Sequence, residues 1–144
     1  MIDGYHLPGG SILLAYYEYV QDKIVWFSIR DGEKKAYIVE DLRFLRNDMG
    51  YTDIKACITD GSLAIIGALR EVYENIIHQR CLVHIQRQVR SYISNRPKFQ
   101  AGKQLKHIMR YRVLSDPFLF PIALQVWETT YRSYLNEKST TANG

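Results

Sequence analysis

The chain has 144 residues, of which 47% are hydrophobic and 24% are charged. This is the composition of one soluble globular protein with a core of its own, and no apolar run is long enough to span a membrane. The two cysteines, Cys57 and Cys81, are too few for a disulfide framework, so we expect a reducing cytoplasm.

The net charge of +4 is distributed unevenly along the chain. Residues 75–115 contain nine Lys or Arg and no Asp or Glu, whereas the remainder, with ten basic and fifteen acidic residues, carries about −5. A basic segment beside an acidic one favours a polyanionic partner. A solvated helical face gives the same pattern, so the charge alone leaves both interpretations open.

The first third of the chain predicts three antiparallel strands. Residues 1–6 hold a short strand that carries Asp3. Residues 12–20 and 24–29 are apolar and aromatic runs, and the three residues between them are enough for a hairpin turn.

A helix is predicted over residues 34–48. Its apolar side chains recur at spacings of four, three and four: Ile38, Leu42, Leu45 and Met49. Such a stripe faces a core, and Gly50 is suited to end the helix.

The most informative stretch begins with a short strand over residues 54–59. Asp60, Gly61 and Ser62 follow it, and a helical stripe continues through residues 65–72. An acid at the carboxyl end of a strand in an α/β sheet lies where ligands usually bind. Asp-Gly is also an ordinary turn signal, and Asp60 or Ser62 can simply cap the helix.

A second short strand at Ile76 and Ile77 leads into a basic helix that starts near residue 82. Pro97 interrupts that helix, and the chain beyond it is predicted to be helical to about residue 136. Ser115 and Asp116, followed by Pro117, mark one of the helix starts.

The order of elements, three antiparallel strands and then alternating helices and strands, is that of the ribonuclease H-like fold, an α/β (α+β) class. In that fold an acid on the first strand lies beside an acid at the end of the fourth, and Asp3 and Asp60 occupy those places. Two carboxylates on neighbouring strands suit Mg²⁺ or Mn²⁺, because these hard cations prefer carboxylate and water oxygens. Such a metal pair can cleave phosphodiesters.

The sequence resembles the mutator-like bacterial insertion-sequence transposases. The resemblance is carried by Ile2-Asp3-Gly4, by the block from Ile58 to Ser62, and above all by Gln79-Arg80-Cys81-Leu82-Val83-His84. It covers essentially the whole chain. It implies a catalytic domain of the Asp-Asp-Glu type that cuts and joins DNA, with transposon ends and target DNA as partners.

The resemblance also implies roles for individual residues. Asp3 and Asp60 are the first two catalytic, metal-binding acids, and Cys81 and His84 form the family's Cys-x-x-His pair, which shapes the site. A zinc site would need two further ligands, of which only His78 is a candidate. The candidate phosphate contacts are basic: Arg80, Arg87, Arg90, Arg96, Lys98 and Lys103.

The predicted organisation is that of an internal fragment. Residues 1–95 form a ribonuclease H-like core that is incomplete at its start and lacks the third acid, residues 96–137 form part of an all-α insertion, and residues 138–144 form a disordered tail. We therefore expect the isolated chain to be inactive, and the complete enzyme to be a homo-oligomer that associates with the nucleoid.

Two other interpretations remain. The first is a non-catalytic basic module that binds nucleic acid. The second is a flavodoxin-like domain, which the three antiparallel strands disfavour, because such sheets are mostly parallel and alternate with helices from the start.

Overall fold

The computed structural model describes residues 1–93 and 95–136. The chain divides into two compact units, Met1–Cys81 and Leu82–Gly144, which are called the first and the second unit and are described separately. The predicted boundary after residue 95 stays a prediction, and the predicted tail, residues 138–144, lies outside the described residues.

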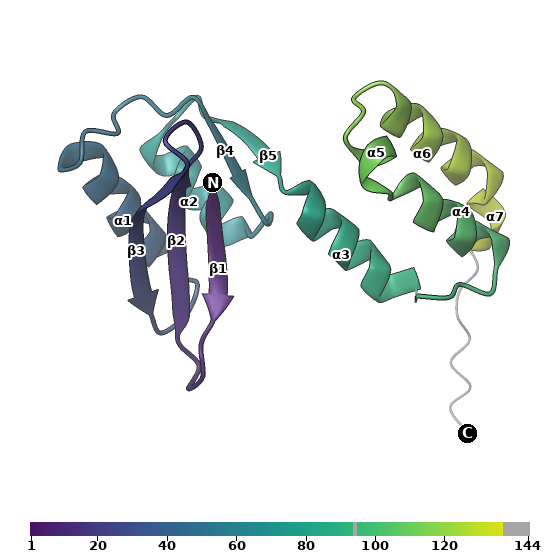
Figure 1. The fold of residues 1–144 in the computed structure, drawn as a ribbon, viewed down its shortest axis with the longest axis horizontal. Helices are drawn as coiled ribbons and strands as arrows, with labels where there is room; N and C mark the ends of the chain where they lie inside the picture. The colour runs from purple at the N-terminus through teal and green to yellow at the C-terminus, as the bar shows by residue number, and fades with distance from the viewer. Residues whose placement is uncertain (94, 137–144) are drawn as a thin grey trace. The chain divides into compact units, whose positions relative to one another are not determined.

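The first unit opens with an antiparallel sheet of three strands, as the sequence predicts (Figure 1). The strands are β1 (Ile2–His6), β2 (Ile12–Glu18) and β3 (Lys23–Arg30), and their spatial order is β1-β2-β3. Asp3 pairs with Ala15 and Gly4 with Leu14, so the register of the central strand sets the position of both residues.

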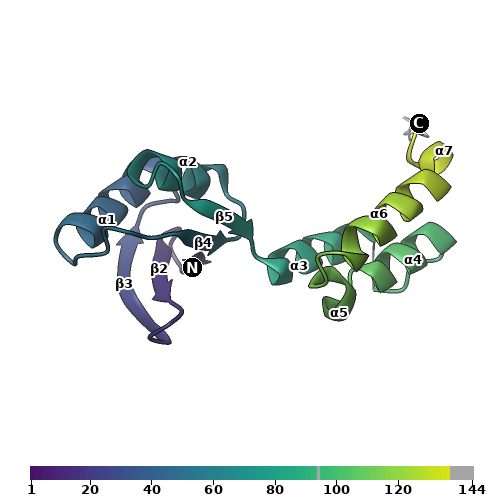
Figure 2. The ribbon, with the colours of Figure 1, turned by 90° about the horizontal axis from the view of Figure 1, so that it is seen from above.

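A parallel pair of short strands completes the first unit. Helix α1 (Lys35–Asn47) leads to β4 (Ala56–Thr59), and α2 (Leu63–Val72) connects β4 to β5 (Ile77–Arg80). The two helices pack against each other on one side of the strands (Figure 2). The chain is thus a mixed α/β protein with an antiparallel three-stranded sheet.

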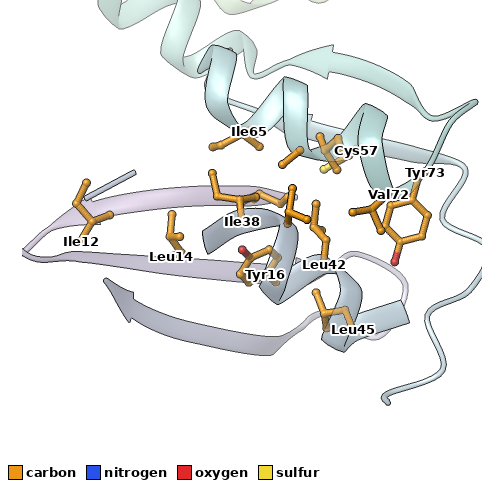
Figure 3. Close-up of a cluster of buried hydrophobic side chains, with 14 residues drawn as sticks. Ile12, Leu14, Tyr16, Ile38, Leu42, Leu45, Cys57, Ile65, Val72 and Tyr73 are labelled. Carbon is orange, nitrogen blue, oxygen red and sulfur yellow. The ribbon is translucent and has the colours of Figure 1, made fainter. Parts of the chain in front are cut away.

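The core of the first unit lies between β2 and the two helices (Figure 3). Alternate residues of β2 point into it, and both helices contribute their apolar stripes. Its largest fully buried apolar side chains are those of Leu14, Ile38, Leu42, Ile65 and Leu69. The predicted stripe of α1 is confirmed except at its last position: Met49 is 40% exposed, because α1 ends at Asn47 and Gly50 follows in a left-handed turn.

One carboxylate is buried between α1 and the sheet. Asp41, only 2% exposed, accepts hydrogen bonds from Tyr16, from Ser28 and from Arg30, whose Nη2 lies 2.7 Å away. Burial, and next to it the charge of Asp41, raises the pKa of the Tyr16 hydroxyl. Every oxygen of this buried acid therefore has a partner, as burial requires.

The other face of the three-stranded sheet is apolar but open to solvent. Successive side chains of a strand alternate between faces, so the residues between the core positions share this second face. Tyr5 is 68% exposed, Phe27 60% and Ile29 59%. No element of the first unit shields these three side chains.

The second unit is helical throughout its described residues. Its helices are α3 (Leu82–Ile93), α4 (Gln100–Ile108), α5 (Tyr111–Leu114), α6 (Leu119–Thr130) and α7 (Arg132–Leu135). The Trp127 indole donates a hydrogen bond to the carbonyl of Ala101, which ties α6 to α4. Among the described residues, no helix combines the length and the apolar character that crossing a bilayer requires.

The predicted helix start before α6 is present. Asp116 Oδ1 accepts hydrogen bonds from the backbone N–H groups of Phe118 and Leu119, at 2.9 and 2.7 Å. These bonds lower the pKa of the Asp116 carboxyl, with the bond from Leu119 the larger cause.

Candidate functional site

Asp3 lies on the edge strand β1, and the pairing of β1 sets the direction of its neighbours. Met1 and Tyr17 exchange two backbone hydrogen bonds, so the amide groups of Ile2 and Gly4 point away from β2, by the alternation of an antiparallel ladder. Asp3 Oδ1 accepts the Gly4 N–H at 3.0 Å. The carboxylate of Asp3 is therefore held at the edge of β1 that is turned away from β2.

Strand β4 lies along this same edge. Cα atoms of β1 and β4 come within 8 Å of each other. Burial raises the pKa of the Cys57 thiol on β4, while the positive amino terminus and a backbone hydrogen bond from Ile2 oppose that rise. In the described chain β1 and β4 belong to separate sheets, so the backbone groups of Gly4 on this edge are not part of a ladder.

Asp60 directly follows β4, where the chain turns into α2. Its Oδ1 accepts the Ser62 N–H at 2.8 Å, whereas Ser62, at the N-cap position, makes no capping bond with its side chain. Gly61 has a φ of +98°, and a Cβ on it would clash with the guanidinium of Arg80. Only glycine fits this turn, and the turn holds the carboxylate of Asp60 half-buried at the end of its strand.

A buried hydroxyl anchors the end of β4 to β5. Thr59 is fully buried, and its Oγ1 lies 2.8 Å from His78 Nε2 and accepts the Gly61 N–H at 3.1 Å. Desolvation first, and then the charges of Arg70 and Arg80, lower the pKa of His78. The neutral imidazole of His78 thus helps to hold the Asp60 turn in place through Thr59.

Of the two predicted acids, Asp3 therefore lies on β1 and Asp60 directly follows the neighbouring strand β4. Among the described residues, no three His, Cys, Asp or Glu side chains are close enough together to hold a metal ion. Two carboxylates still fit Mg²⁺, because this cation keeps several waters and takes one or two protein carboxylates. A hollow of about 410 Å³, lined by Ile2 and Tyr16 among others, includes neither acid and is not this site.

The predicted Cys81 and His84 pair divides between the units. Cys81 is the residue before α3 rather than part of it, and its backbone N–H donates to the carbonyl of Thr59 at 2.6 Å. The backbone of this half-buried residue is thus attached to the end of β4, next to Asp60. His84 is half-buried on α3 in the second unit.

All six predicted phosphate contacts are exposed. The Arg80 Nη2 atom lies 3.5 Å from the carbonyl of Asp60, so this guanidinium supports the Asp60 turn. The other five belong to the second unit, and the structure shows no ion pair for them within its described residues: Arg87, Arg90, Arg96, Lys98 and Lys103. By sequence the second unit carries ten Lys or Arg against three Asp or Glu, whereas the first carries nine against twelve.

The sequence analysis did not predict one acid, Glu33, that lies close to β1. A Cβ on Gly4 would stand 3.1 Å from Glu33 Oε2, so this carboxylate lies against β1 at the residue after Asp3. Glu33 comes between β3 and α1, and its neighbours in the sequence give no sign of a contact twenty-nine positions away.

The sequence matches a known protein family. The model described as "Transposase, Mutator family" matches residues 20–119, which include Asp60, Cys81, His84 and the basic segment but not Asp3. No curated protein matches the sequence.

Proposed function

This chain belongs to the Mutator family of transposases, and we propose that its first unit is the ribonuclease H-like part of a catalytic domain that cuts and joins DNA with divalent metal ions. The observation that supports the proposal is that Asp3 lies on β1 and Asp60 directly follows β4, two strands whose Cα atoms come within 8 Å of each other. The family match supports an enzyme of transposition that acts on DNA.

Asp3 and Asp60 are the residues that would hold Mg²⁺ or Mn²⁺. Each carboxylate has one oxygen held by a backbone N–H, at 3.0 Å for Asp3 and 2.8 Å for Asp60. This fixes the orientation of the second oxygen, as a ligand position requires. When bound, a pair of such cations supplies an activated oxygen nucleophile and stabilises the leaving oxygen.

The second unit is proposed to bind the DNA backbone. Its surplus of basic residues and the exposure of Arg87 and Arg90 on one face of α3 support this, since residues three apart lie on the same side of a helix. Arginine suits this task because its planar fork matches phosphate oxygens.

Three finer points complete the proposal. Cys81 is proposed to shape the site through its backbone hydrogen bond to the end of β4, and the family resemblance gives His84 the same role. The complete enzyme is a homo-oligomer. Because only two of the family's three acids are assigned in these 144 residues, we expect this chain to hold the cations weakly and not to join DNA strands.

The experiment is a Mn²⁺ titration of the chain followed by electron paramagnetic resonance of the free ion. The wild-type chain should show saturable binding that Asp3→Asn and Asp60→Asn abolish. Asp53→Asn is the matched control, because Asp53 is exposed in the first unit and pairs with Lys55 at 2.6 Å. Equal binding by all four proteins would overturn the assignment of both acids.

A non-catalytic DNA-binding module is the second candidate, and the charge of the second unit favours it. It predicts DNA binding that weakens steeply with salt, needs no divalent cation and survives Asp60→Asn. DNA binding that requires Mg²⁺ and is lost in Asp60→Asn would instead favour the catalytic proposal.

A further inference from the structure

We propose that the second unit binds single-stranded DNA, and that an unpaired base stacks on an exposed aromatic pair, Phe99 and Tyr134. This rests on the function proposed above, which assigns the DNA backbone to the basic residues of the second unit. The inference adds the bases as a second point of contact and names the form of DNA that the surface accepts.

The exposed ring of Phe99 is the first observation. Phe99 stands at the N-cap position of α4 and is 67% exposed. Its ring lies beside that of Tyr134 on α7, with 6.0 Å between the ring centroids and 43° between the ring planes. Tyr134 is itself 44% exposed. Because the two rings already pack on each other, Phe99 loses little side-chain freedom when a third ring stacks on it.

The backbone that carries Phe99 is held against α4. A Cβ on Gly102 would stand 2.8 Å from the Cβ of Pro97, so glycine at this position lets the segment before α4 lie close to the helix. The Nζ atom of Lys106 donates a hydrogen bond to the carbonyl of Asn95 at 2.5 Å. The ring of Phe99 is therefore presented from a fixed segment.

Positive charge on both sides of Phe99 is the second observation. Lys98 is its direct neighbour, and Lys103 stands one helical turn away, since its N–H donates to the carbonyl of Phe99 at 3.1 Å. Arg96 is at most about 11 Å away along the chain. All three basic residues are exposed, and residues 75–115 contain no Asp or Glu. The surface around the ring thus complements the phosphates of a nucleic-acid strand.

The chemistry of DNA decides which form fits this surface. In a duplex each base is stacked between its neighbours, and the grooves expose only base edges and the backbone. An unpaired base has a free face, and aromatic side chains within basic surfaces stack on such faces. An apolar segment of a protein partner would use the ring but would leave the positive charges without a counterpart.

The test is fluorescence anisotropy of the whole chain with a labelled oligo(dT) of about 12 nucleotides and with a duplex of the same length. Phe99→Ala should weaken the binding of oligo(dT) about 5- to 150-fold, the loss expected for one stacked base, and should leave duplex binding unchanged. The slope of log affinity against log salt for oligo(dT) should not change, because stacking releases no counterions. Phe99→Trp, which keeps an aromatic face, should retain the binding of oligo(dT).

Phe118→Ala is the matched control. Phe118 is also an exposed ring at the N-cap position of a helix of the second unit, where it precedes α6 and is 81% exposed. Residues 113–131, however, contain no Lys or Arg. The variant should bind both oligonucleotides like the wild type, because its ring has no basic neighbours to hold a strand.

The outcomes separate this inference from the function on which it rests. If Phe99→Ala binds oligo(dT) like the wild type, the aromatic contact is refuted and binding of the DNA backbone stands. Equal losses for oligo(dT) and the duplex, or for Phe99→Ala and Phe118→Ala, would also refute the contact with an unpaired base. Tighter binding of oligo(rU) than of oligo(dT) would overturn the assignment to DNA. If the wild type binds neither DNA, this inference and the proposed role of the second unit both fall.

Discussion

The two units of the chain differ in both packing and charge. The first unit has one continuous buried cluster that draws on its strands and helices, and its acids outnumber its basic residues. In the described part of the second unit only four apolar residues are buried, and basic residues dominate: the buried four are Ala101, Ile108, Met109 and Leu114. Stability and the candidate cation site are therefore features of the first unit, and attraction to a polyanion is a feature of the second.

The largest effect expected from this difference is on stability. Leu42→Ala removes a side chain that is 1% exposed in the core of the first unit, and it should lower the free energy of unfolding by about 2–5 kcal/mol. Val126→Ala, on a residue of α6 that is 61% exposed, should change it by less than about 0.5 kcal/mol. Urea unfolding followed by circular dichroism measures both.

Each unit has one tryptophan, which makes the comparison sharper. With Trp127 replaced by phenylalanine, the fluorescence of Trp26 reports on the first unit alone, because Trp26 packs on Phe44 with ring centroids 4.6 Å apart. If Leu42→Ala and Val126→Ala lowered the free energy of unfolding equally in this background, the difference in packing between the units would be contradicted.

The next effect concerns charge. If the exposed arginines of α3 contact DNA phosphates, Arg87→Gln and Arg90→Gln should each reduce the slope of log affinity against log salt by about 0.9. Fluorescence anisotropy with a short DNA duplex measures the slope. Lys55→Gln in the first unit removes the same charge and should leave the slope unchanged. If the slope falls equally in all three variants, net charge alone explains the change, and α3 has no special contact with DNA.

The smallest effect is a pH dependence of the first unit. Because desolvation and the charges of Arg70 and Arg80 lower the pKa of His78 in the folded chain, protonation favours the unfolded chain. The contribution of His78 to stability is therefore complete above the unfolded pKa of about 6.5 and is lost as the pH falls below it. Urea unfolding between pH 5 and pH 8 should show this loss in the wild type, and His78→Gln should lack it.

The local elements of the first unit could be predicted well from the sequence. The spacing of Ile38, Leu42 and Leu45 gave a correct helix, because hydrophobic periodicity depends only on near neighbours. The same pattern failed at Met49, where the end of the helix, and not the period, decides exposure. The helix start at Asp116 was predictable for the same local reason.

The candidate site was less predictable, because its geometry depends on contacts between distant segments. The contact of Glu33 with Gly4 joins residues twenty-nine positions apart, and the contact of Arg80 with the Asp60–Gly61 turn joins residues nineteen and twenty apart. The hydrophobic periodicity of the sequence contains no information about such long-range contacts. The sequence predicts Arg80 as a phosphate contact, which stays a prediction, and the structure adds a contact of Arg80 with the turn.

The open sheet face with Tyr5, Phe27 and Ile29 has a consequence for handling the protein. Large exposed apolar patches are uncommon on soluble monomers, since such surfaces stick to one another. A high protein concentration, rather than heat, should then be the first cause of aggregation. Dilute samples with a mild detergent should keep the folded chain in solution.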